Sequence, residues 1–242
     1  MAKMEKPLAM VTGAARRLGR AFALSLARQG YAIFLHYNLS NEEAAATEKE
    51  ITAMGIPVYP YQADLTSATD IEALFSYLDT LPNPLRILVN SAALMPRADI
   101  RTLPLVEWDK VMALNLRAPF VMAQQAALRM KEGGLIVNIT DAGASKAWTG
   151  FPAYSVSKVG LEALMRVQAK AFAPKIRVNA IAPGLVLPAA NLSPEDWNKL
   201  VDRLPLKRST STDEITSALE FLIDNQSITG QTIIVDGGFS LT

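Results

Sequence analysis

The sequence predicts an α/β protein in which a parallel sheet of seven strands is covered by helices on both faces. Short apolar runs, typical of buried parallel strands, alternate along the chain with longer segments of helical period. Half of the 242 residues are hydrophobic, which is enough for a sizeable core. The sequence shows no linker, repeat or low-complexity tract, so we expect residues 1–242 to form a single domain.

The strands are expected where short apolar runs end in glycine or polar residues. In chain order these runs cover residues 7–12, 31–37, 56–61, 85–90, 134–140, 176–181 and 231–235. Because helical segments separate most of them, neighbouring strands should run parallel and be joined by crossovers. Asp64 sits just past the third run, and Asp141 just past the fifth.

The helices are expected where apolar residues recur with helical period, in segments 18–29, 41–54, 68–81, 104–130, 153–172, 194–203 and 212–222. Gly30 and Gly55 follow the first two at the position where glycine commonly ends a helix, and Asn41 is expected to cap the second. Pro119 predicts a bend in the fourth. Residues 185–211 contain three prolines and are expected to form a lid over a substrate.

Composition excludes several classes of protein. Basic and acidic residues number 24 and 23, so neither a nucleic acid nor an acidic membrane surface is an expected partner. The chain has no cysteine, which excludes disulfides, thiolate catalysis and thiolate metal sites, and its single histidine, His36, argues against a histidine-based metal site. The start has no signal-peptide pattern and no apolar run reaches about 18 residues, so we expect a cytoplasmic protein without a membrane span.

A turn rich in small residues joins the first expected strand to the first expected helix. It reads TGAARRLG over residues 12–19, with Gly13 and Gly19 near its two ends. Glycine lets backbone N–H groups approach a diphosphate, and the following helix N-terminus favours the anion, so the turn predicts a dinucleotide site. Arg17 stands where a strict pattern has a further glycine. The alternative is a tight strand–helix turn that binds no ligand.

The end of the second expected strand indicates which nicotinamide cofactor is bound. An acidic residue there would bind the ribose 2′-hydroxyl and select NAD, but residues 36–40 read HYNLS and contain no carboxylate. Arg16 and Arg17 of the neighbouring turn could hold a 2′-phosphate, and Ser40 could hydrogen-bond to it. We therefore predict NADP(H). The alternative is that the two arginines are solvated surface charges.

Tyr154 and Lys158 lie four residues apart near the start of an expected helix, so both should face the same side. An ammonium beside a phenol stabilises the phenolate, and we therefore expect the pKa of Tyr154 to fall from about 10 toward working pH. This makes Tyr154 a candidate proton donor and acceptor. Taken alone, so short a pattern more often marks a surface tyrosine and lysine on an ordinary helix.

Together these motifs resemble the short-chain dehydrogenase/reductase family over essentially the whole chain. The matching positions are residues 12–19, Asp64, residues 90–93 (NSAA), Asn115, Tyr154, Lys158, Asn179, residues 183–184 and residues 236–238. The resemblance implies a Rossmann fold, hydride transfer to or from a carbonyl or imine, and usually a homotetramer, with a dimer as the alternative. It also implies that the cofactor contacts Gly13, Arg16, Arg17, Leu18, Gly19, Tyr37, Asn38, Ser40, Asp64, Leu65, Asn90, Ser91, Ala92, Tyr154, Lys158, Pro183 and Gly184.

The resemblance further assigns catalytic roles to Asn115, Asp141, Tyr154 and Lys158. Tyr154 exchanges the proton, Lys158 binds the nicotinamide ribose and acidifies the tyrosine, and Asn115 carries a water of the proton relay. Most members have serine thirteen residues before the tyrosine, where this chain has Asp141. A carboxylate would repel a carbonyl oxygen, so it suits a substrate with N–H donors, or a second proton source with a raised pKa. Thr140, one residue earlier, would point to the other face.

That aspartate, with the turn AARRLG and the strand end LHY at residues 35–37, is similar to pteridine reductases. The similarity implies a pterin that is flanked by Asp141 and Tyr154 and stacked on the nicotinamide. Met95 is expected on the other face of the pterin, where some pteridine reductases have phenylalanine, and Leu185 completes the expected substrate contacts. We therefore expect an NADPH-dependent reductase of a C=N or C=O group, most simply of a pterin.

Three other functions are compatible with parts of the sequence. One is a general NADPH-dependent carbonyl or 3-oxoacyl reductase in which Asp141 is incidental. Another is a non-catalytic NADP-binding redox sensor, against which the intact Asn115, Tyr154 and Lys158 argue. An enoyl reductase is disfavoured, because that group spaces its tyrosine and lysine more widely.

Overall fold

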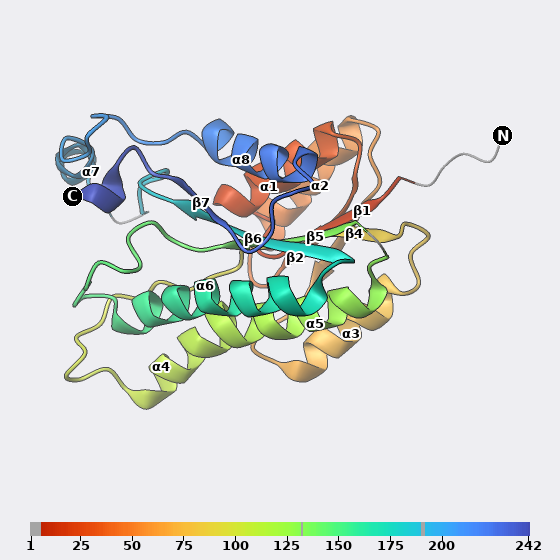
Figure 1. The fold of residues 1–242 in the computed structure, drawn as a ribbon, viewed down its shortest axis with the longest axis horizontal. Coiled ribbons are helices and arrows are strands. Elements are labelled where there is room, and N and C mark those ends of the chain that lie inside the picture. Colours follow the sequence, from red (N-terminus) through yellow and green to blue (C-terminus); the bar gives the residue numbers. More distant parts are fainter. Residues whose placement is uncertain (1–5, 132, 190–191) are drawn as a thin grey trace.

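The computed structural model describes residues 6–131, 133–189 and 192–242, which fold around one sheet (Figure 1). Its strands are β1 (Leu8–Val11), β2 (Ala32–Tyr37), β3 (Val58–Gln62), β4 (Leu85–Asn90), β5 (Gly134–Ile139), β6 (Ile176–Pro183) and β7 (Thr232–Val235). They are ordered β3-β2-β1-β4-β5-β6-β7, and every neighbouring pair is parallel. The expected seven-stranded parallel sheet is therefore confirmed.

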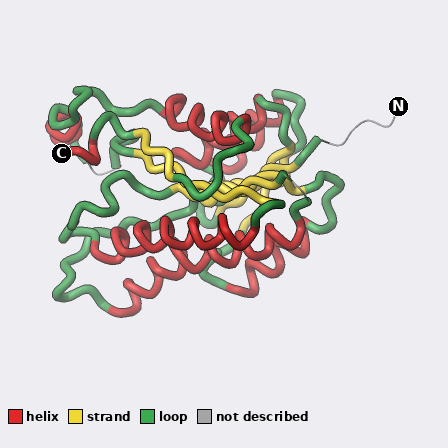
Figure 2. The backbone as a smooth tube through the Cα atoms, viewed as in Figure 1, coloured by secondary structure: helices red, strands yellow, loops and turns green. Residues whose placement is uncertain are grey.

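Helices form a layer on each face of the sheet, as Figure 2 shows. One layer contains α1 (Arg17–Arg28), α2 (Asn41–Ala53) and α8 (Thr212–Asp224), and the other contains α3 (Ala68–Leu78), α4 (Leu105–Met112), α5 (Ala118–Arg129) and α6 (Pro152–Phe172). The short helix α7 (Pro194–Val201) lies at one end of the molecule, near the C-terminus. Successive strand residues point into opposite layers, so Met10 and Val11 belong to two different buried clusters. Both faces of the sheet are therefore core.

The observed ends of the elements differ from the expected ones by a few residues. β6 continues two residues beyond its expected end, because the carbonyl oxygen of Pro183 still accepts a hydrogen bond from the N–H of Ala142 at 3.0 Å. The expected cap of α2 is wrong by one residue. Asn41 is already helical, and Ser40 is the residue at the cap, although its side chain makes no capping hydrogen bond.

The expected bend near Pro119 takes the form of a widened helical turn. A π-helical segment, η1 (Ala113–Arg117), joins α4 to α5 and ends two residues before the proline. Proline has no N–H to donate to the carbonyl four residues earlier, which is that of Asn115, and this favours a local change in the hydrogen-bond pattern. The chain therefore stays helical through the bend, and Asn115 lies in the widened turn.

The strand order reverses between β1 and β4. The chain leaves β1 toward β2 and β3, and then returns to β4 on the opposite side of β1. Connections that diverge in this way open a crevice at the carboxyl ends of the strands, where α/β folds bind ligands. Gly13 follows β1 and Asn90 ends β4, so the expected phosphate turn lies at this crevice.

Candidate active site

The turn that follows β1 is held tightly against the end of β4. Thr12 is buried, and its hydroxyl oxygen accepts hydrogen bonds from the N–H groups of Ser91 and Ala92 at 2.9 and 3.0 Å. Gly13 has φ +66°, and a Cβ there would lie 3.1 Å from the Cα of Ala92. A Cβ at Gly19 would lie 2.0 Å from the carbonyl oxygen of Gly13. The turn therefore requires both glycines, and it offers the bare backbone that a diphosphate needs for close approach.

Arg17, an expected ligand of a 2′-phosphate, contacts the lid in this structure. Its backbone has φ +53°, a strained conformation for a residue with a side chain. Its guanidinium donates hydrogen bonds to the carbonyl oxygens of Leu187 and Pro188, both at 2.9 Å. Arg16 is exposed immediately before α1, whereas Leu18 packs against the core. The phosphate turn and the lid are thus directly connected, which the sequence did not predict.

The residues expected around the adenosine end of the cofactor lie at the ends of β2 and β3. They are Tyr37, Asn38, Ser40, Asp64 and Leu65. The carboxylate Oδ1 of Asp64 accepts hydrogen bonds from the N–H and the hydroxyl of Thr66 at 2.9 and 2.8 Å, which fixes its direction. On β4, the amide of Asn90 donates to Oδ1 of Asn138 at 2.8 Å. These residues lie at the carboxyl ends of β2, β3 and β4, and their contacts to a cofactor stay predictions.

Asp141, Tyr154 and Lys158 converge at the carboxyl end of β5. The Tyr154 hydroxyl donates to Oδ2 of Asp141 at 2.6 Å, and the N–H of Gly143 donates to Oδ1 at 2.7 Å. Lys158 donates from Nζ to the carbonyl oxygen of Ile139 at 2.7 Å, and its Nζ lies 5.7 Å from the centre of the Tyr154 ring. The tyrosine and lysine therefore face the same side of α6, as their spacing predicts, and the tyrosine meets the aspartate.

Burial controls the pKa values of these three side chains. It raises the pKa of Asp141, although the hydrogen bonds from Tyr154 and Gly143 and the charge of Lys158 act against it. It lowers the pKa of Lys158 to about 8. It also raises the pKa of Tyr154 well above 10, and the Asp141 carboxylate raises it further. The raised pKa that proton sharing by Asp141 requires is present, whereas the expected fall of the Tyr154 pKa is wrong, because burial and the carboxylate dominate.

Asn115 connects the loop after β4 to the start of α6. Its Oδ1 accepts from the N–H of Leu94 at 2.8 Å, and its Nδ2 donates to the carbonyl oxygen of Leu94 at 2.8 Å and to the hydroxyl of Ser157 at 3.1 Å. Ser157 in turn donates to the carbonyl oxygen of Tyr154 at 2.7 Å. The sequence did not single out Ser157, because a serine three residues after a tyrosine is too common a pattern. The role of Asn115 as a water carrier stays a prediction.

The C-terminal turn η2 (Phe239–Leu241) packs against the loop that carries the aspartate. Trp148 and Phe239 have ring centres 5.9 Å apart. Lys146 donates to the carbonyl oxygen of Phe239 and, at 3.0 Å, to the hydroxyl of Thr242, and its ammonium lies 3.9 Å from the centre of the Phe239 ring. We name this group of residues the C-terminal clasp (Lys146, Trp148, Phe239 and Thr242).

The remaining expected site residues lie on loops around the carboxyl ends of the strands. Met95 is 44% exposed after β4, and Leu185 begins the lid, where its carbonyl oxygen accepts from the N–H of Thr210 at 2.9 Å. Pro183 ends β6, and a Cβ on Gly184 would lie 2.7 Å from the Cα of Asp236. Residues 190–191 of the lid lie outside the described residues. Within the described part of the chain, no group of three or more His, Cys, Asp or Glu side chains could hold a metal ion.

The sequence matches one family model and many known reductases. The model, described as enoyl-(acyl carrier protein) reductase, matches residues 13–240. Among curated relatives, the 3-oxoacyl-[acyl-carrier-protein] reductase FabG of Staphylococcus aureus is 33% identical over 243 residues, which cover 98% of each chain.

Two solved structures that bind a nicotinamide cofactor have the same fold. FolM alternative dihydrofolate reductase 1 from Brucella canis, complexed with NADP, superimposes with a TM-score of 0.92 at 36% identity and covers 98% of this chain and 94% of that one. A blue fluorescent protein from a metagenomic library, in complex with NADPH, superimposes with a TM-score of 0.91 at 30% identity and covers 98% of both chains.

Proposed function

The chain belongs to the short-chain dehydrogenase/reductase family, and from this premise we propose that it is an NADPH-dependent reductase of a pterin. The assignment of NADP(H) as the cofactor is supported by the tight turn at Gly13 and Gly19, which fits a diphosphate. It is also supported by the NADP(H) bound in the two solved relatives. Residues 36–40 contain no carboxylate that would repel a 2′-phosphate. In this proposal residues 1–242 form one cofactor-binding domain, with residues 185–211 as the substrate lid.

The pairing of Asp141 with Tyr154 is the observation that favours a pterin. A ketone offers a catalytic site only an acceptor oxygen, and a carboxylate would repel it. A pterin also offers N–H and amino groups, which a carboxylate can bind through charge-assisted hydrogen bonds. The Brucella relative, by its name, reduces dihydrofolate, whose ring system is a pterin.

Reduced nicotinamide supplies the hydride when it is bound. The residues of this chain supply orientation and protons. The 2.6 Å hydrogen bond lets Tyr154 and Asp141 share a proton beside the substrate, and burial raises the pKa of both groups. The proton is therefore held until a basic atom of the substrate accepts it. Lys158, with a pKa of about 8, stays largely protonated at neutral pH and balances the negative charge left on the pair.

A second candidate function is the reduction of a 3-oxoacyl thioester. The observations in its favour are the 33% identity to FabG and the exposed Met95, which provides no aromatic ring to stack on a pterin. A substrate panel distinguishes the two candidates. We expect NADPH oxidation with dihydrobiopterin and dihydrofolate to exceed that with acetoacetyl thioesters by at least about tenfold in kcat/KM. The opposite order would favour the second candidate.

The variant Tyr154→Phe tests the chemistry. It removes the donating hydroxyl from the pair, so we expect turnover to fall by roughly 10²- to 10⁴-fold while NADPH affinity changes less than about threefold. Turnover is measured by NADPH oxidation and affinity by cofactor fluorescence. Tyr31→Phe is the matched control, because Tyr31 lies just before β2, at the end of the sheet away from the candidate site. Normal turnover of Tyr154→Phe would contradict the mechanism.

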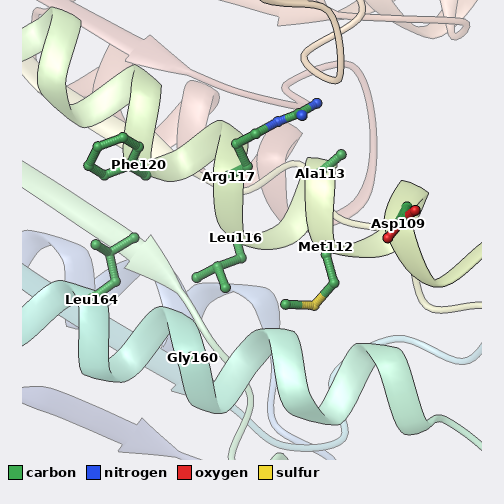
Figure 3. Close-up of a pocket in the computed structure, with 8 residues that line it drawn as sticks. All are labelled: Asp109, Met112, Ala113, Leu116, Arg117, Phe120, Gly160 and Leu164. Carbon is green, nitrogen blue, oxygen red and sulfur yellow. The ribbon is translucent and has the colours of Figure 1, made fainter.

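We also propose that the chain forms a homotetramer, or a dimer, through the layer of α4, α5 and α6. Large apolar side chains on these helices are exposed in the single chain, including Val106, Phe120, Val159 and Val167. Between them lies a groove of about 670 Å³, lined by Asp109, Met112, Ala113, Leu116, Arg117, Phe120, Gly160 and Leu164 (Figure 3). A second copy would cover these apolar faces.

We further propose a cytoplasmic location, which suits a reductase that depends on NADPH. The structure adds one observation: among the described residues, no helix is long and apolar enough to cross a membrane.

A further inference from the structure

His36, the single histidine of the chain, joins the ends of three neighbouring strands. It lies on β2 and is fully buried. Its Nδ1 accepts a hydrogen bond from the N–H of Gly13, which follows β1, at 3.1 Å. Its Nε2 lies 3.1 Å from the carbonyl oxygen of Ala63, which follows β3. The backbone carbonyl oxygen of His36 also accepts from the N–H of Ala14 at 2.8 Å.

These contacts define one protonation state of the ring. The N–H of Gly13 can only donate, so Nδ1 must carry a lone pair, and the carbonyl oxygen of Ala63 can only accept, so Nε2 must carry the hydrogen. The imidazolium would place the Nδ1 hydrogen against the N–H of Gly13. Burial agrees with the neutral form, because it lowers the pKa of His36 to about 4, against the opposing effects of the Ala63 carbonyl and the Asp64 carboxylate.

The two turns that His36 joins are both parts of the cofactor site of the proposed function. Gly13 opens the phosphate turn, and Ala63 immediately precedes Asp64, the residue expected near the adenine. The N–H groups of Gly13 and Ala14 both point at His36, so a diphosphate must be bound by later N–H groups of the turn and by the N-terminus of α1. The position of those groups then depends on where His36 holds the turn.

We propose that His36, as the Nε2–H tautomer, is a positioning residue for NADPH. It holds the phosphate turn in place relative to the turn after β3, which carries Asp64. The proposal rests on the cofactor site of the proposed function. Its critical contact is the one from Gly13 to Nδ1, because that contact orients the phosphate turn. The contact from Nε2 to Ala63 holds the ring in place. The two contacts can be separated by substitution.

A pair of variants separates them. In His36→Asn, the side-chain Oδ1 can occupy the place of Nδ1 and accept from Gly13, but the contact to Ala63 is lost. In His36→Gln, the side-chain amide can reach the place of Nε2 and donate to Ala63, but the N–H of Gly13 loses its acceptor. Both variants shorten or open a buried ring, so general damage to the core should be similar. The Kd of NADPH, measured by fluorescence titration, is the comparison that matters.

We expect His36→Asn to keep the Kd of NADPH within about threefold of the wild type. We expect His36→Gln to raise it by roughly five- to a hundredfold, because NADPH must then order a turn that has lost its anchoring hydrogen bond. Equal changes in Kd for the two variants would overturn the proposal. Wild-type protein that binds no NADPH would overturn the proposed function as well, so the two failures are distinguishable.

A spectroscopic measurement on the wild type does not depend on either variant folding. Because the chain has one histidine, protein labelled with ¹⁵N-histidine gives a single pair of ring signals. We expect the shifts of the Nε2–H tautomer at pH 7, unchanged when NADP is added, and no titration near the ordinary pKa of about 6.5. The Nδ1–H tautomer, or an ordinary titration, would overturn the proposal.

Discussion

The hydrogen bond that Tyr154 donates to Asp141 is the chemical peculiarity of this site. A hydroxyl opposite the tyrosine could donate to a carbonyl oxygen and accept from an N–H group, but it could neither store a proton nor bind a substrate N–H group through a charge-assisted hydrogen bond. A half-buried carboxyl with a raised pKa can do both. The preference for a pterin over a ketone should therefore depend on the Asp141 side chain more than on the shape of the substrate site.

Exchanging the Asp141 carboxylate for a hydroxyl should shift the preference of the enzyme from pterins toward small ketones. In Asp141→Ser the charge-assisted hydrogen bond to a pterin N–H is lost, so we expect kcat/KM for dihydrobiopterin to fall by roughly 10- to 100-fold. Small ketones should be reduced as well as before or better, because the repulsion is removed. Steady-state kinetics on both substrates measure the effect, with Thr140→Ser on the neighbouring residue as the control. An unchanged ratio of the two activities would refute the role of Asp141.

Single residues also show how far sequence reasoning reaches. The spacing of Tyr154 and Lys158 predicted that they share one face of a helix, because a helical period is a local property. That Asp141 joins them was expected only from the family resemblance. The direction of the tyrosine pKa was not predictable, since it depends on burial and on the aspartate, which belong to the folded protein. Ser157 and His36 were missed as site residues for the same reason: their partners lie on elements that only the fold brings near.

At the scale of the elements, the contact between the phosphate turn and the lid is the least expected feature. Arg17 occupies a left-handed backbone conformation in which glycine would cost nothing, and it uses its guanidinium to hold two successive carbonyl groups of the lid. Strained residues persist where surrounding contacts hold them, often at functional sites. The lid is therefore attached to the turn that is proposed to bind the cofactor.

Removing this attachment should loosen the lid. In Arg17→Ala both hydrogen bonds are lost, and at about 0.5–1.5 kcal/mol for each typical hydrogen bond we expect trypsin cleavage at Lys199 and Arg203 to be roughly five- to a hundredfold faster. Gel densitometry of a limited digest measures the rate. Arg16→Ala removes an exposed arginine from the adjacent position and is the control. Equal rates for the two variants would show that Arg17 does not hold the lid.

The helical segment around Pro119 illustrates the limit of prediction for an element. A proline in a long helical pattern predicted a bend, because it lacks an N–H donor. Whether the helix breaks, kinks or widens depends on the contacts of the neighbouring turn. Here Asn115 is held between Leu94 and Ser157, and the turn widens around it while the helix continues.

At the scale of the molecule, the alternation of strands and helices predicted the parallel sheet but not its strand order. Each crossover can return to either side of the preceding strand, and the choice that creates the crevice between β1 and β4 is made by packing over long sequence distances. Prediction was therefore good for the number and type of elements. It was weaker for contacts that cross the crevice, such as the one between Arg17 and the lid.

The proposed subunit interface can be tested by adding a charge to it. Phe120 is 45% exposed and lies at one end of the groove of Figure 3, with Asp109 at the other end. In Phe120→Glu an apolar anchor is replaced by a charge that a partner would bury, so we expect the subunit dissociation constant to rise by about thirtyfold or more. Light scattering after size exclusion measures the mass. Met54→Glu, at the end of α2 in the opposite layer, should leave the mass unchanged. A monomeric wild type would refute the interface.

The stability of the protein should depend on pH through His36. Its pKa is about 6.5 in the unfolded chain and about 4 in the folded one, so the unfolded state takes up the proton first and stability falls as pH falls between these values. We expect a loss of about 2 kcal/mol between pH 7 and pH 5, measured by urea unfolding. Asp141, whose pKa is raised, acts in the opposite direction. The difference between wild type and His36→Asn therefore isolates the histidine, and identical pH dependence in both would contradict the assignment.

The C-terminal clasp has a practical consequence for anyone who produces this protein. Thr242 accepts a hydrogen bond from Lys146, which lies on the same loop as the Asp141 carboxylate. A purification tag fused at Thr242 would lie next to the loop of the candidate active site and would compete with the C-terminal clasp for space. In Figure 1 the first strand, β1, lies toward the opposite end of the molecule from the C-terminus, so an amino-terminal tag is the better choice for kinetic work.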